Sequence, residues 1–446
     1  MSPKVTVIMP SLNVAKYITT CMESVLAQTL QDLEILAIDA GSTDGTLEIL
    51  QEFAKKDKRI RIVHSEKRSY GYQLNLGIAM AAGEYVGVVE TDDFIVPEMY
   101  ERLYHEAIQT EMDYVKGAVQ LFVEVSPGLY WEGPIGRTFG EDDMYGKVLC
   151  PRKMPDLLLK DYYLWIGIYR QDFIKRIVLN ETPGAAYQDA GFMFQTYMKA
   201  ERAIYLTDIF YWYRQDNMGA SSYSRKAFNF FVQEYDYMEK FLQGESEEWR
   251  EVYYQRMFYH CRRKFMVMGV SGEFWEDALP DIRELQSRLR SAKQQGILNE
   301  QNLEPDLREQ LLLFLENERA VYEMYAAQYK PKAENIHAML EKVADHDAII
   351  FGSGKRGRFM RMLMEYKRPG VVKAFCDNQE KLWGTAVLGM QVMAPEEANR
   401  QYPKAVYLIA GKGYEAQMRE QLSQLGVEEK RMFTYTAGED KELFHI

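Results

Sequence analysis

Three acidic side chains follow one apolar segment of the chain within four residues. Glu90, Asp92 and Asp93 stand directly after the apolar residues 85–89, and carboxylates this close repel one another unless a cation is shared among them. Mg²⁺ takes oxygen ligands and commonly joins one or two carboxylates to substrate phosphates. The spacing therefore predicts a site for a divalent cation and a diphosphate. A solvated acidic turn before Pro97 is an equally weighted alternative from these residues alone.

The elements that must position these acids are a set of short strands. Between residues 4 and 119, apolar runs alternate with helical spacing, which predicts a parallel sheet covered by helices. Strands are predicted at 5–9, 33–38, 60–63 and 85–89, with a helix near 72–81. Ligands bind beyond the carboxyl ends of such strands. We therefore expect the polar clusters that follow the strands to converge: Pro10, Ser11 and Asn13; Asp39 with the turn 41–45; residues 64–75; and Glu90, Thr91, Asp92 and Asp93.

Several segments of this half stand in a recognisable order. VTVIMPSLN, AIDAGSTDGT, the loop from Gly71 to Asn75, AAGEY and VVETDDF resemble, in order and spacing, the family 2 glycosyltransferases of GT-A fold. The resemblance covers about the first half of the chain. It implies a nucleotide-diphosphate-sugar donor, a Mg²⁺ or Mn²⁺ ion, and inversion at the anomeric carbon.

The resemblance also implies roles for single residues. Ser11 and Asn13 match positions that line the nucleotide pocket, and Asp39 falls in the turn that binds the base. Asp92 and Asp93 match the acids that hold the metal and the diphosphate. The full set expected to bind the donor is Pro10, Ser11, Asn13, Asp39, Gly71, Asn75, Glu90, Thr91, Asp92 and Arg214.

Two positions depart from the family pattern. The chain has Asp39 followed by Ala40 where the family has paired aspartates, and Glu90 where the family has the first aspartate of its acidic motif. We expect a UDP-sugar donor, but the missing second aspartate leaves the base of the nucleotide open. Glu90 is one methylene longer than that aspartate, so the metal ligands expected are Asp92 and Asp93.

An inverting transfer needs one carboxylate that takes the proton of the acceptor hydroxyl. Asp189, in the segment AYQDAGF, matches the base motif of the family, with Gln188 in the place of the usual partner. Without the resemblance, Asp189 would be interpreted as a helix N-cap. We therefore predict Asp189 to be the general base.

Aromatic residues are dense between residues 121 and 213, which indicates a pocket-forming half that includes Trp131. Trp165 and Tyr187 are expected to line the acceptor pocket, and a core position is the alternative for Trp165. Arg214 ends a segment that resembles the aromatic-Arg strand of the family, where a cation approaches the diphosphate. A surface ion pair is its alternative role.

The end of the chain carries a second glycine motif. Gly352, Gly354 and Gly357 follow a predicted strand at 348–351 and open a helix, and Asp377 follows another strand at 372–376. Dinucleotide-binding units have this pattern, and the segment resembles small Rossmann-like modules appended to sugar-modifying proteins. We weigh a structural or regulatory role above nicotinamide chemistry.

The length of 446 residues indicates more than one domain. We predict an α/β chain with a GT-A domain at 1–225, a helical subdomain at 226–330 and a Rossmann-like α/β domain at 335–446. A polar stretch at 330–334 that contains Pro331 is predicted to be a linker. A later strand is predicted at 405–410.

Composition narrows the classes of function. A net charge of −12 argues against nucleic-acid binding, and four dispersed cysteines without a C-x-x-C pair suggest neither zinc nor disulfides. The chain shows no signal-peptide pattern and no apolar run of about 18 residues. We expect a cytoplasmic protein, with peripheral attachment to the inner face of the membrane left open.

The function predicted is metal-dependent transfer of a sugar to a hydroxyl of a glycan, a glycolipid or a related acceptor. Two alternatives remain at this point. One is a nicotinamide-dependent sugar-modifying enzyme centred on the C-terminal domain, and the other is a catalytically silent nucleotide-sugar-binding protein.

Overall fold

Apolar runs near the start of the chain form the centre of a mixed sheet in the computed structural model, which describes residues 2–109, 111–140, 142–161, 163–217, 219–220 and 223–446. The chain divides into two units. The first comprises 1–122, 134–264 and 275–318, and the second comprises 123–133, 265–274 and 319–446.

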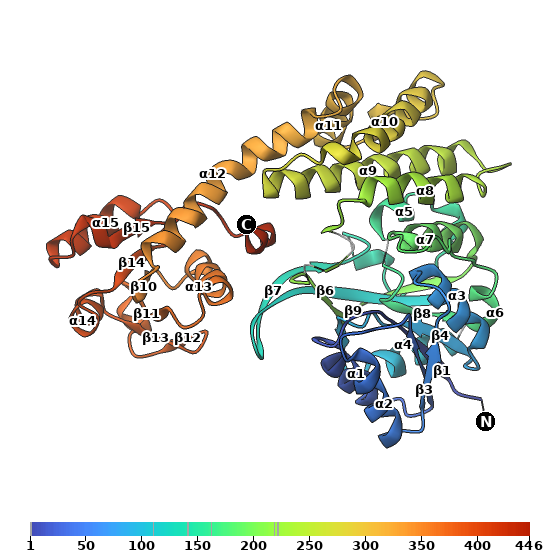
Figure 1. Ribbon diagram of the computed structural model, residues 1–446, viewed down its shortest axis with the longest axis horizontal. Helices are drawn as coiled ribbons and strands as arrows, with labels where there is room; N and C mark the ends of the chain where they lie inside the picture. Colours follow the sequence, from blue (N-terminus) through green and yellow to red (C-terminus); the bar gives the residue numbers. More distant parts are fainter. Residues whose placement is uncertain (1, 110, 141, 162, 218, 221–222) are drawn as a thin grey trace. The chain divides into compact units, whose positions relative to one another are not determined.

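The first unit is built on one large sheet (Figure 1). Its strands are β1 Val5–Ser11, β2 Leu33–Asp39, β3 Ile60–His64, β4 Tyr85–Val88, β5 Phe94–Ile95, β6 Tyr114–Ser126, β7 Leu129–Gly136, β8 Gly167–Arg170 and β9 Ala203–Arg214. The order is β3-β2-β1-β4-β8-β6-β9-β5, and β7 pairs with β6. β1 to β4 are mutually parallel where they pair, which confirms the predicted parallel sheet.

The other half of this sheet is not part of the predicted pattern. β8 runs antiparallel to β4 and β6, β9 runs parallel to β6, and β5 runs antiparallel to β9. The pairing of Phe94 with Trp212 brings the loop that follows β4 to the end of β9. A crossover of this kind joins residues more than a hundred positions apart, and no local pattern encodes it.

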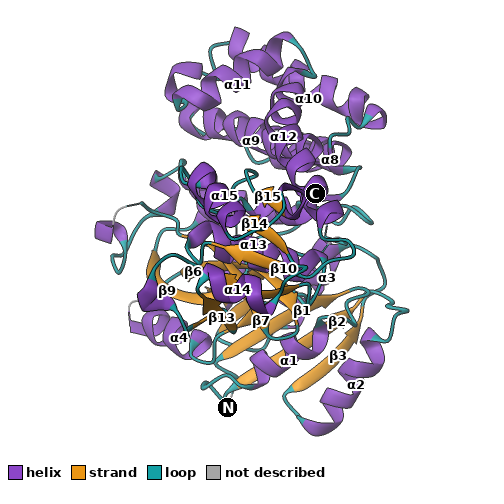
Figure 2. Ribbon diagram, turned by 90° about the vertical axis from the view of Figure 1, so that its left-hand side faces the viewer, coloured by secondary structure: helices purple, strands orange, loops and turns teal. Residues whose placement is uncertain are grey.

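Seven helices among the described residues accompany this sheet. They are α1 Ile18–Leu26, α2 Thr46–Lys56, α3 Tyr70–Met80, α4 Met99–Gln109, α5 Leu157–Lys160, α6 Gln171–Ile174 and α7 Gln188–Lys199. α1 buries Cys21, Met22 and Val25 at helical spacing, and Figures 1 and 2 show α1 and α2 beside β1 to β3. α3 packs closely on the sheet, because a Cβ at Gly77 would lie 2.7 Å from Ile8 Cγ2.

A helical region follows, as predicted. It contains α8 Ala227–Glu239, α9 Glu247–Ser271, α10 Leu279–Gln294 and α11 Pro305–Glu316. The next helix, α12 Ala320–Lys342, belongs to the second unit and shows that the predicted linker is wrong, because α12 runs through residues 330–334 (Figure 1). Proline costs one helical hydrogen bond, but Tyr329 and Ile336 are buried on either side of Pro331. Packing therefore outweighs the break that proline favours.

The second unit has a sheet of its own. Its strands are β10 Ala348–Phe351, β11 Val372–Cys376, β12 Ala386–Val387, β13 Met390–Met393, β14 Val406–Ile409 and β15 Met432–Thr434, in the order β12-β13-β11-β10-β14-β15. All pairs except β12 with β13 are parallel. The helices are α13 Lys355–Lys367, α14 Pro395–Gln401 and α15 Glu415–Gln424. Alternate residues of β10 enter two separate apolar clusters, so the sheet is buried on both faces.

The end of the β6–β7 hairpin belongs to this second unit. Val123 and Val125 join one of its apolar clusters. The ring of Trp131 packs 5.9 Å from that of Phe359 and 5.3 Å from that of Phe444, centroid to centroid. The expectation that Trp131 helps to form a pocket in the first half is therefore wrong. Trp131 is a packing residue of the second unit.

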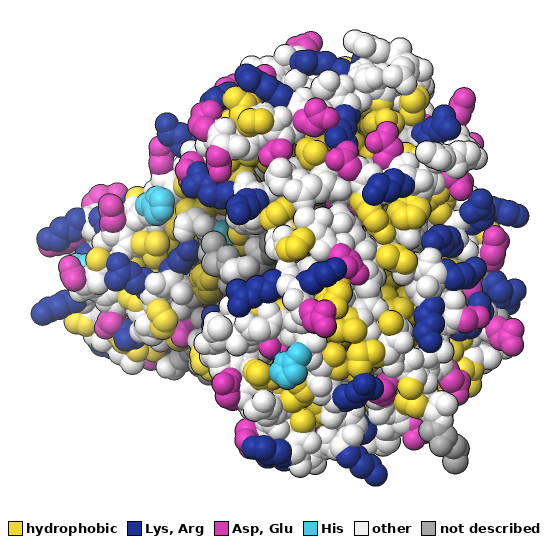
Figure 3. Space-filling model, turned by 45° about the vertical axis from the view of Figure 1, so that its right-hand side comes forward, with side chains coloured by type: hydrophobic (Ala, Val, Ile, Leu, Met, Phe, Trp, Pro, Cys, Tyr) yellow, Lys and Arg dark blue, Asp and Glu magenta, His cyan; other side chains and the backbone are white. Residues whose placement is uncertain are grey.

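Charged side chains of both signs are interspersed on the molecular face drawn in Figure 3. Among the described residues, no helix is both long enough and apolar enough to span a bilayer. The two predicted domain boundaries, at 225 and near 335, remain predictions.

Candidate functional site

The carboxyl ends of β1, β2 and β4 bring the first polar clusters together. Ser11 lies directly beside Asp39 in the sheet, and Thr91 Oγ1 donates to the carbonyl of Pro10 at 2.9 Å. Gln73 Nε2, from α3, donates to the carbonyls of Ser11 and Ile38 at 3.1 and 2.7 Å. These hydrogen bonds tie three separate segments into one sheet edge.

The turn after β2 is shaped by two side chains predicted to meet the nucleotide. Asp39 is buried, and its carboxylate accepts from the amides of Gly41 and Ser42 at 2.9 and 3.1 Å. Asn13 Oδ1 accepts from the amide of Thr43 at 2.8 Å. Gly41 has φ +83°, a conformation that favours glycine. Asp39 and Asn13 therefore fix the shape of the turn on which a base would rest.

Arg68, in the segment before α3, contacts this turn and was missed by the sequence analysis. Its guanidinium donates to the carbonyl of Gly41 at 3.1 Å, and its side chain is exposed. The sequence did hold a sign of this contact, because Arg68 is a cation within the polar cluster 64–75.

Gly71 and Asn75 make structural contacts. The Gly71 amide donates to Gln188 Oε1 at 3.0 Å, and a Cβ there would lie 1.9 Å from the carbonyl oxygen of Asn180. Asn75 Nδ2 donates to the carbonyl of Leu179 at 3.0 Å. Both residues bind the segment that leads to α7 against α3.

Glu90 is held inside the acidic loop. Its Oε1 accepts from the Tyr70 hydroxyl, and its amide donates to the Tyr211 hydroxyl at 3.0 Å. Burial and the charges of Asp92 and Asp189, opposed by the hydrogen bond from Tyr70, raise the pKa of Glu90 to about 8. The carboxyl groups of Glu90, Asp92 and Asp189 therefore interact with one another.

Asp92 and Asp93 differ in exposure. Asp92 is half-buried, and its Oδ2 accepts from Asn217 Nδ2 at 2.8 Å. Asp93 is 1% exposed, and its Oδ1 accepts from the Arg214 amide at 2.7 Å. Asp93 Oδ2 makes no hydrogen bond with the described residues. The nearby Tyr211 hydroxyl lowers the pKa of Asp93. Burial, and then the charge of Asp92, hold the pKa of Asp93 well above its usual range.

Arg214 joins the acidic loop to the end of β9. Its Nε donates to the carbonyl of Asp92 at 2.8 Å, and its Nη1 lies 3.2 Å from Asp216 Oδ2. The guanidinium also lies 4.7 Å from the ring centroid of Tyr17 and 4.8 Å from that of Phe122. Both partners of the ion pair are buried, so the alternative of a surface ion pair is wrong.

The acidic loop suits a hard divalent cation in its chemistry. Among the described residues, no group of three or more Asp, Glu, His or Cys side chains could hold a metal ion. Mg²⁺ is commonly bound by one or two carboxylates, with phosphate and water completing its ligands. Burial and the charge of Asp92 raise the pKa of Asp93, and its buried Oδ2 has no hydrogen-bond partner among the described residues. A cation beside Asp92 would favour the ionised form of Asp93, so the residues fit such an ion.

Asp189 lies in the first turn of α7, where the N-cap is Tyr187 with φ +71°. The N-cap interpretation of Asp189 is therefore wrong. Its Oδ1 accepts from the amide of Ala190 at 3.0 Å, and the side chain is half-buried. Burial raises the pKa of Asp189, and the charge of Arg256 opposes this. Gln188 is fully buried and joins α7 to the Gly71 amide.

Trp165 is 5% exposed and stacks on Tyr211, with ring centroids 4.1 Å apart. The rings of Tyr163 and Tyr213 each lie 4.8 Å from the Trp165 ring, centroid to centroid. The Tyr211 hydroxyl accepts a hydrogen bond from the Glu90 amide, so this aromatic cluster is joined to the acidic loop. The packing of Trp165 agrees with its core alternative.

Tyr187 is half-buried, and its ring lies 4.5 Å from that of Phe231 on α8. Its side chain also lies near α9, which supplies Arg256, His260 and Lys264 at this end of the site. The sequence analysis predicted a helical subdomain here and assigned no site residue to it. The missed signal was the spacing of these three basic residues, each one helical turn from the next.

The C-terminal glycine motif forms a compact loop. Gly352 has φ +102°, and a Cβ at Gly357 would lie 1.8 Å from the carbonyl oxygen of Gly352. The Asp377 carboxylate accepts from the amide and the hydroxyl of Ser353 at 2.8 and 2.7 Å. Gly354 is the N-cap of α13. The predicted residues therefore meet at the ends of β10 and β11, where Asp377 holds the loop.

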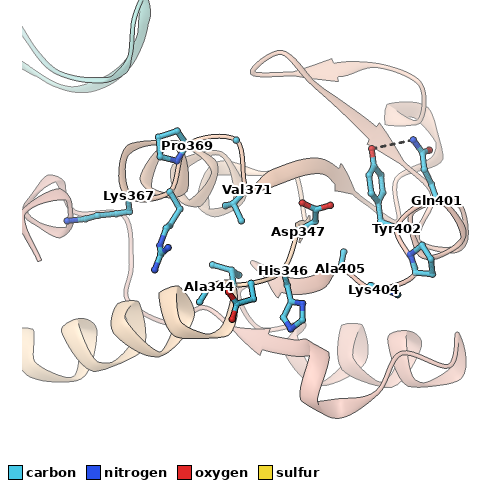
Figure 4. Close-up of a pocket in the computed structure, with 15 residues that line it drawn as sticks. Ala344, His346, Asp347, Lys367, Pro369, Val371, Gln401, Tyr402, Lys404 and Ala405 are labelled. Atoms are coloured by element: carbon cyan, nitrogen blue, oxygen red, sulfur yellow. Dashed lines mark hydrogen bonds between the residues drawn. The ribbon is translucent and has the colours of Figure 1, made fainter.

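A cavity of about 760 Å³ lies at the opposite edge of the same sheet, lined by residues 343–347, 367–371 and 401–405 (Figure 4). Asp347, Val371 and Ala405, which line it, directly precede β10, β11 and β14. The cavity is thus at the amino ends of the strands, away from the glycine loop.

Known proteins share sequence with this chain. The family model described as glycosyl transferase family 2 matches residues 6–150. The chain is 30% identical to the glycosyltransferase GlyG of Streptococcus pneumoniae serotype 4, over 48% of this chain and 72% of that protein. It is 31% identical to the uncharacterized glycosyltransferase EpsJ of Bacillus subtilis, over 48% of this chain and 62% of that protein.

Solved structures show the same fold. The S. aureus TarS 1–349 structure is similar with a TM-score of 0.51 and 20% identity, over 74% of this chain and 91% of that one. The same protein in complex with UDP-GlcNAc gives a TM-score of 0.50. These findings confirm the expected α/β fold of GT-A type, with a helical region and a second sheet. The chain belongs to glycosyl transferase family 2 and is a glycosyltransferase.

Proposed function

We propose that this glycosyltransferase moves a sugar from a nucleotide-diphosphate-sugar to an acceptor hydroxyl with inversion and with a divalent metal. The observation that carries the proposal is the pair of half-buried carboxylates, Asp92 and Asp189, in one site. They come from different elements that α3 links: the Tyr70 hydroxyl donates to Glu90, and the neighbouring Gly71 amide donates to Gln188 Oε1. One carboxylate serves the leaving diphosphate and the other serves the attacking hydroxyl.

The donor proposed is a UDP-sugar. The turn that follows β2 offers Asp39, Asn13 and the exposed Arg68 around Gly41, a polar surface suited to a base and a ribose. The structure of TarS with UDP-GlcNAc supports this class of donor by analogy. Ala40 stands where the family has a second aspartate, so other bases belong in the same test.

The metal proposed is Mg²⁺ or Mn²⁺, held by Asp92 with Asp93 beside it. When bound, such an ion neutralises the charge that develops on a leaving diphosphate. Arg214 keeps the loop in place through the Asp92 carbonyl and its own amide. Its buried position makes it a positioning residue for both acids.

Asp189 is proposed as the general base. In the transfer, the Asp189 carboxylate takes the proton of the acceptor hydroxyl while that oxygen forms a bond to the anomeric carbon. The bond between the anomeric carbon and the diphosphate oxygen breaks, and the electron pair leaves with the diphosphate. Burial raises the pKa of Asp189, and the positive charge of Arg256 opposes the rise. A pKa raised towards the working pH suits a general base.

The acceptor proposed is a glycan, a glycolipid or a related precursor in the cytoplasm or at the inner face of the membrane. The glycine loop of the second unit is proposed to be structural or regulatory, since its Asp377 carboxylate already bonds to Ser353. A nicotinamide-dependent enzyme would need that carboxylate for a ribose.

A panel of nucleotide-sugars tests this function with the full chain. With Mg²⁺ or Mn²⁺ present, one UDP-sugar should raise the melting temperature, because a ligand that binds only the folded state stabilises it. The same donor should then release UDP when acceptors are added. Stabilisation by NADH alone would overturn the proposal, and donor binding without turnover on any acceptor would favour a silent binding protein.

A further inference from the structure

α8 packs against the first turn of α7 at two points, one on each side of Asp189. The ring of Phe231 lies 4.5 Å from that of Tyr187, centroid to centroid. Three residues further along α8, Glu234 approaches Gly191 so closely that a Cβ there would lie 2.0 Å from Glu234 Oε1. Asp189 stands midway between Tyr187 and Gly191 in the sequence. The turn that carries the proposed base is therefore held by α8.

Glu234 is a buried acid that also holds the chain before α7. It is 2% exposed, and its Oε2 accepts from Asn180 Nδ2 at 3.1 Å. Asn180 Oδ1 accepts from the Thr182 hydroxyl at 2.9 Å, and the Thr182 carbonyl accepts from Gln188 Nε2 at 3.3 Å. Acidic side chains are almost never buried this fully unless they are paired. One carboxyl group thus joins α8 both to α7 and to the segment that leads into it.

The surroundings of Glu234 favour its uncharged form. Burial, opposed by the hydrogen bond from Asn180 and supported by the charge of Asp189, raises the pKa of Glu234 to about 8. Within the part of the chain that the structure describes, the side chain that bonds to Glu234 is an amide and not a cation. A buried carboxylate without a nearby cation is costly. Ionisation of Glu234 therefore weakens the packing of α8 on the start of α7.

The other titratable groups around this contact come from α7, α8, α9 and the chain before α7. They are Asp189, Tyr235, Tyr237, Arg256, His260, Lys264, and Glu181 with its partner Lys67. Burial and the charge of Arg263 lower the pKa of Lys264 to about 7, and the pKa of Glu90 in the acidic loop is about 8. A change of rate near pH 8 must therefore be assigned with a variant of Glu234.

We propose that Glu234 is a positioning residue for Asp189: its uncharged carboxyl group holds the first turn of α7 in place for the transfer. This inference rests on the proposed function, because it takes Asp189 as the group that receives the proton of the acceptor. Gly191 is the counterpart of Glu234 on α7, since a larger side chain there would displace the carboxyl group. Loss of the proton from Glu234 releases the turn, while Asp189 itself stays ionised.

The first test follows turnover with pH in the full chain, with the donor and acceptor that support transfer in the panel. A group with a pKa of about 8 is about nine-tenths ionised at pH 9, so wild-type turnover should fall roughly tenfold between pH 7 and 9. Glu234→Gln can still accept from Asn180 but cannot ionise, so its turnover should change by less than about twofold over that range. Glu239→Gln is the matched control and should follow the wild type, because Glu239 is an exposed glutamate of the same helix.

The second test separates positioning from donor binding. Gly191→Ala and Glu234→Ala should each lower kcat by roughly tenfold and leave the KM for the donor unchanged, because both release the turn that carries the base. Their effects should not add in the double variant, since Glu234→Ala removes the group that the added methyl would meet. Glu234→Gln should retain most of the turnover that Glu234→Ala loses. Where Glu234→Ala does not fold, Gly191→Ala against Glu234→Gln carries the comparison.

A third measurement needs no transfer. NMR of isotopically labelled glutamate carboxyl groups in the full chain reports each pKa, and Glu234→Gln identifies the signal of Glu234. Asp189→Asn removes a neighbouring negative charge, so the pKa of Glu234 should fall in that variant. It should not change in Glu239→Gln.

An equal alkaline fall in Glu234→Gln and in the wild type would overturn the inference and assign the fall to another group, such as Glu90 or Lys264. A wild-type rate that is constant from pH 7 to 9 would overturn it as well, and so would a loss of donor affinity that matches the loss of turnover. Absence of transfer by the wild type would instead refute the proposed function. The titration of Glu234 in Asp189→Asn would then decide by itself whether Glu234 acts on the turn that carries Asp189.

Discussion

Asp189→Asn tests the proposed base directly. The side chain keeps its shape and most of its hydrogen bonding but cannot take up a proton at neutral pH. The loss of a general base typically costs about 10²- to 10⁴-fold in turnover, or roughly 3 to 5 kcal/mol of activation free energy. Donor affinity should stay near that of the wild type, because Asp189 belongs to the acceptor side.

The stability of this variant follows from the surroundings of Asp189. The residue is not the N-cap of α7, so no cap is lost, and the carboxylate's interaction with the helix dipole is worth about 0.3 to 1 kcal/mol. Against this, burial raises the pKa of Asp189 in the folded protein. Folding therefore favours the protonated acid, and ionisation costs the wild type stability as pH rises through the unfolded and then the folded pKa.

Asn has no such cost, so the variant should melt close to the wild type or slightly above it at neutral pH, with the advantage disappearing in acid. Asp281→Asn is the matched control, because Asp281 lies in the first turn of α10, is half-buried and bonds to Asn229. The assay combines melting temperature, donor affinity and transfer rate from pH 5 to 8. If Asp189→Asn transferred sugar at the wild-type rate, and if that rate still fell at acid pH as in the wild type, Asp189 would not be the general base.

Chelation should weaken donor binding by roughly tenfold or more, since the diphosphate would then face the ionised Asp92 as a like charge; calorimetry with and without EDTA measures this. Arg214→Gln should destabilise the protein by about 3 to 5 kcal/mol, because Asp216 is left as a buried charge without its arginine; urea unfolding measures it. Gly357→Ala should cost about 1 to 3 kcal/mol by overpacking. Gly354→Ala, which meets nothing within 4 Å, is its matched control.

Three other results would contradict these predictions. Unchanged donor affinity in EDTA would remove the metal from the proposal. A small effect of Arg214→Gln would mean that water or rearrangement satisfies Asp216. Equal stability of the two glycine variants would show that the close approach of Gly357 to Gly352 is relieved at no cost.

Local sequence pattern was enough to predict several strands and the order of the polar residues at their ends. The strands predicted at 348–351 and 372–376 have those bounds in the structure, and the one predicted at 33–38 is longer by a single residue. Such strands are buried on both faces, so their apolar runs are nearly continuous. The parallel order then places Ser11 and Asp39 at one edge without further information.

Tertiary structure decided where the chain crosses back on itself. The antiparallel half of the sheet brings Arg214 to Asp93, 121 residues away in sequence, and a local pattern holds no record of that pairing. It also decided that α12 continues through Pro331, because burial of the flanking residues outweighs a helix propensity that is only a weak prior.

The roles of Asp189 and of α9 show the same division. The sequence placed an acid at the start of a helix, but only the folded chain makes Tyr187 the N-cap and leaves the Asp189 carboxylate half-buried. The spacing of Arg256, His260 and Lys264 was visible in the sequence, whereas the ring contacts of Tyr187 with α9 arise from packing between distant helices. Propensity and periodicity act over a few residues, while the charge around a site is the sum over every element that packs there.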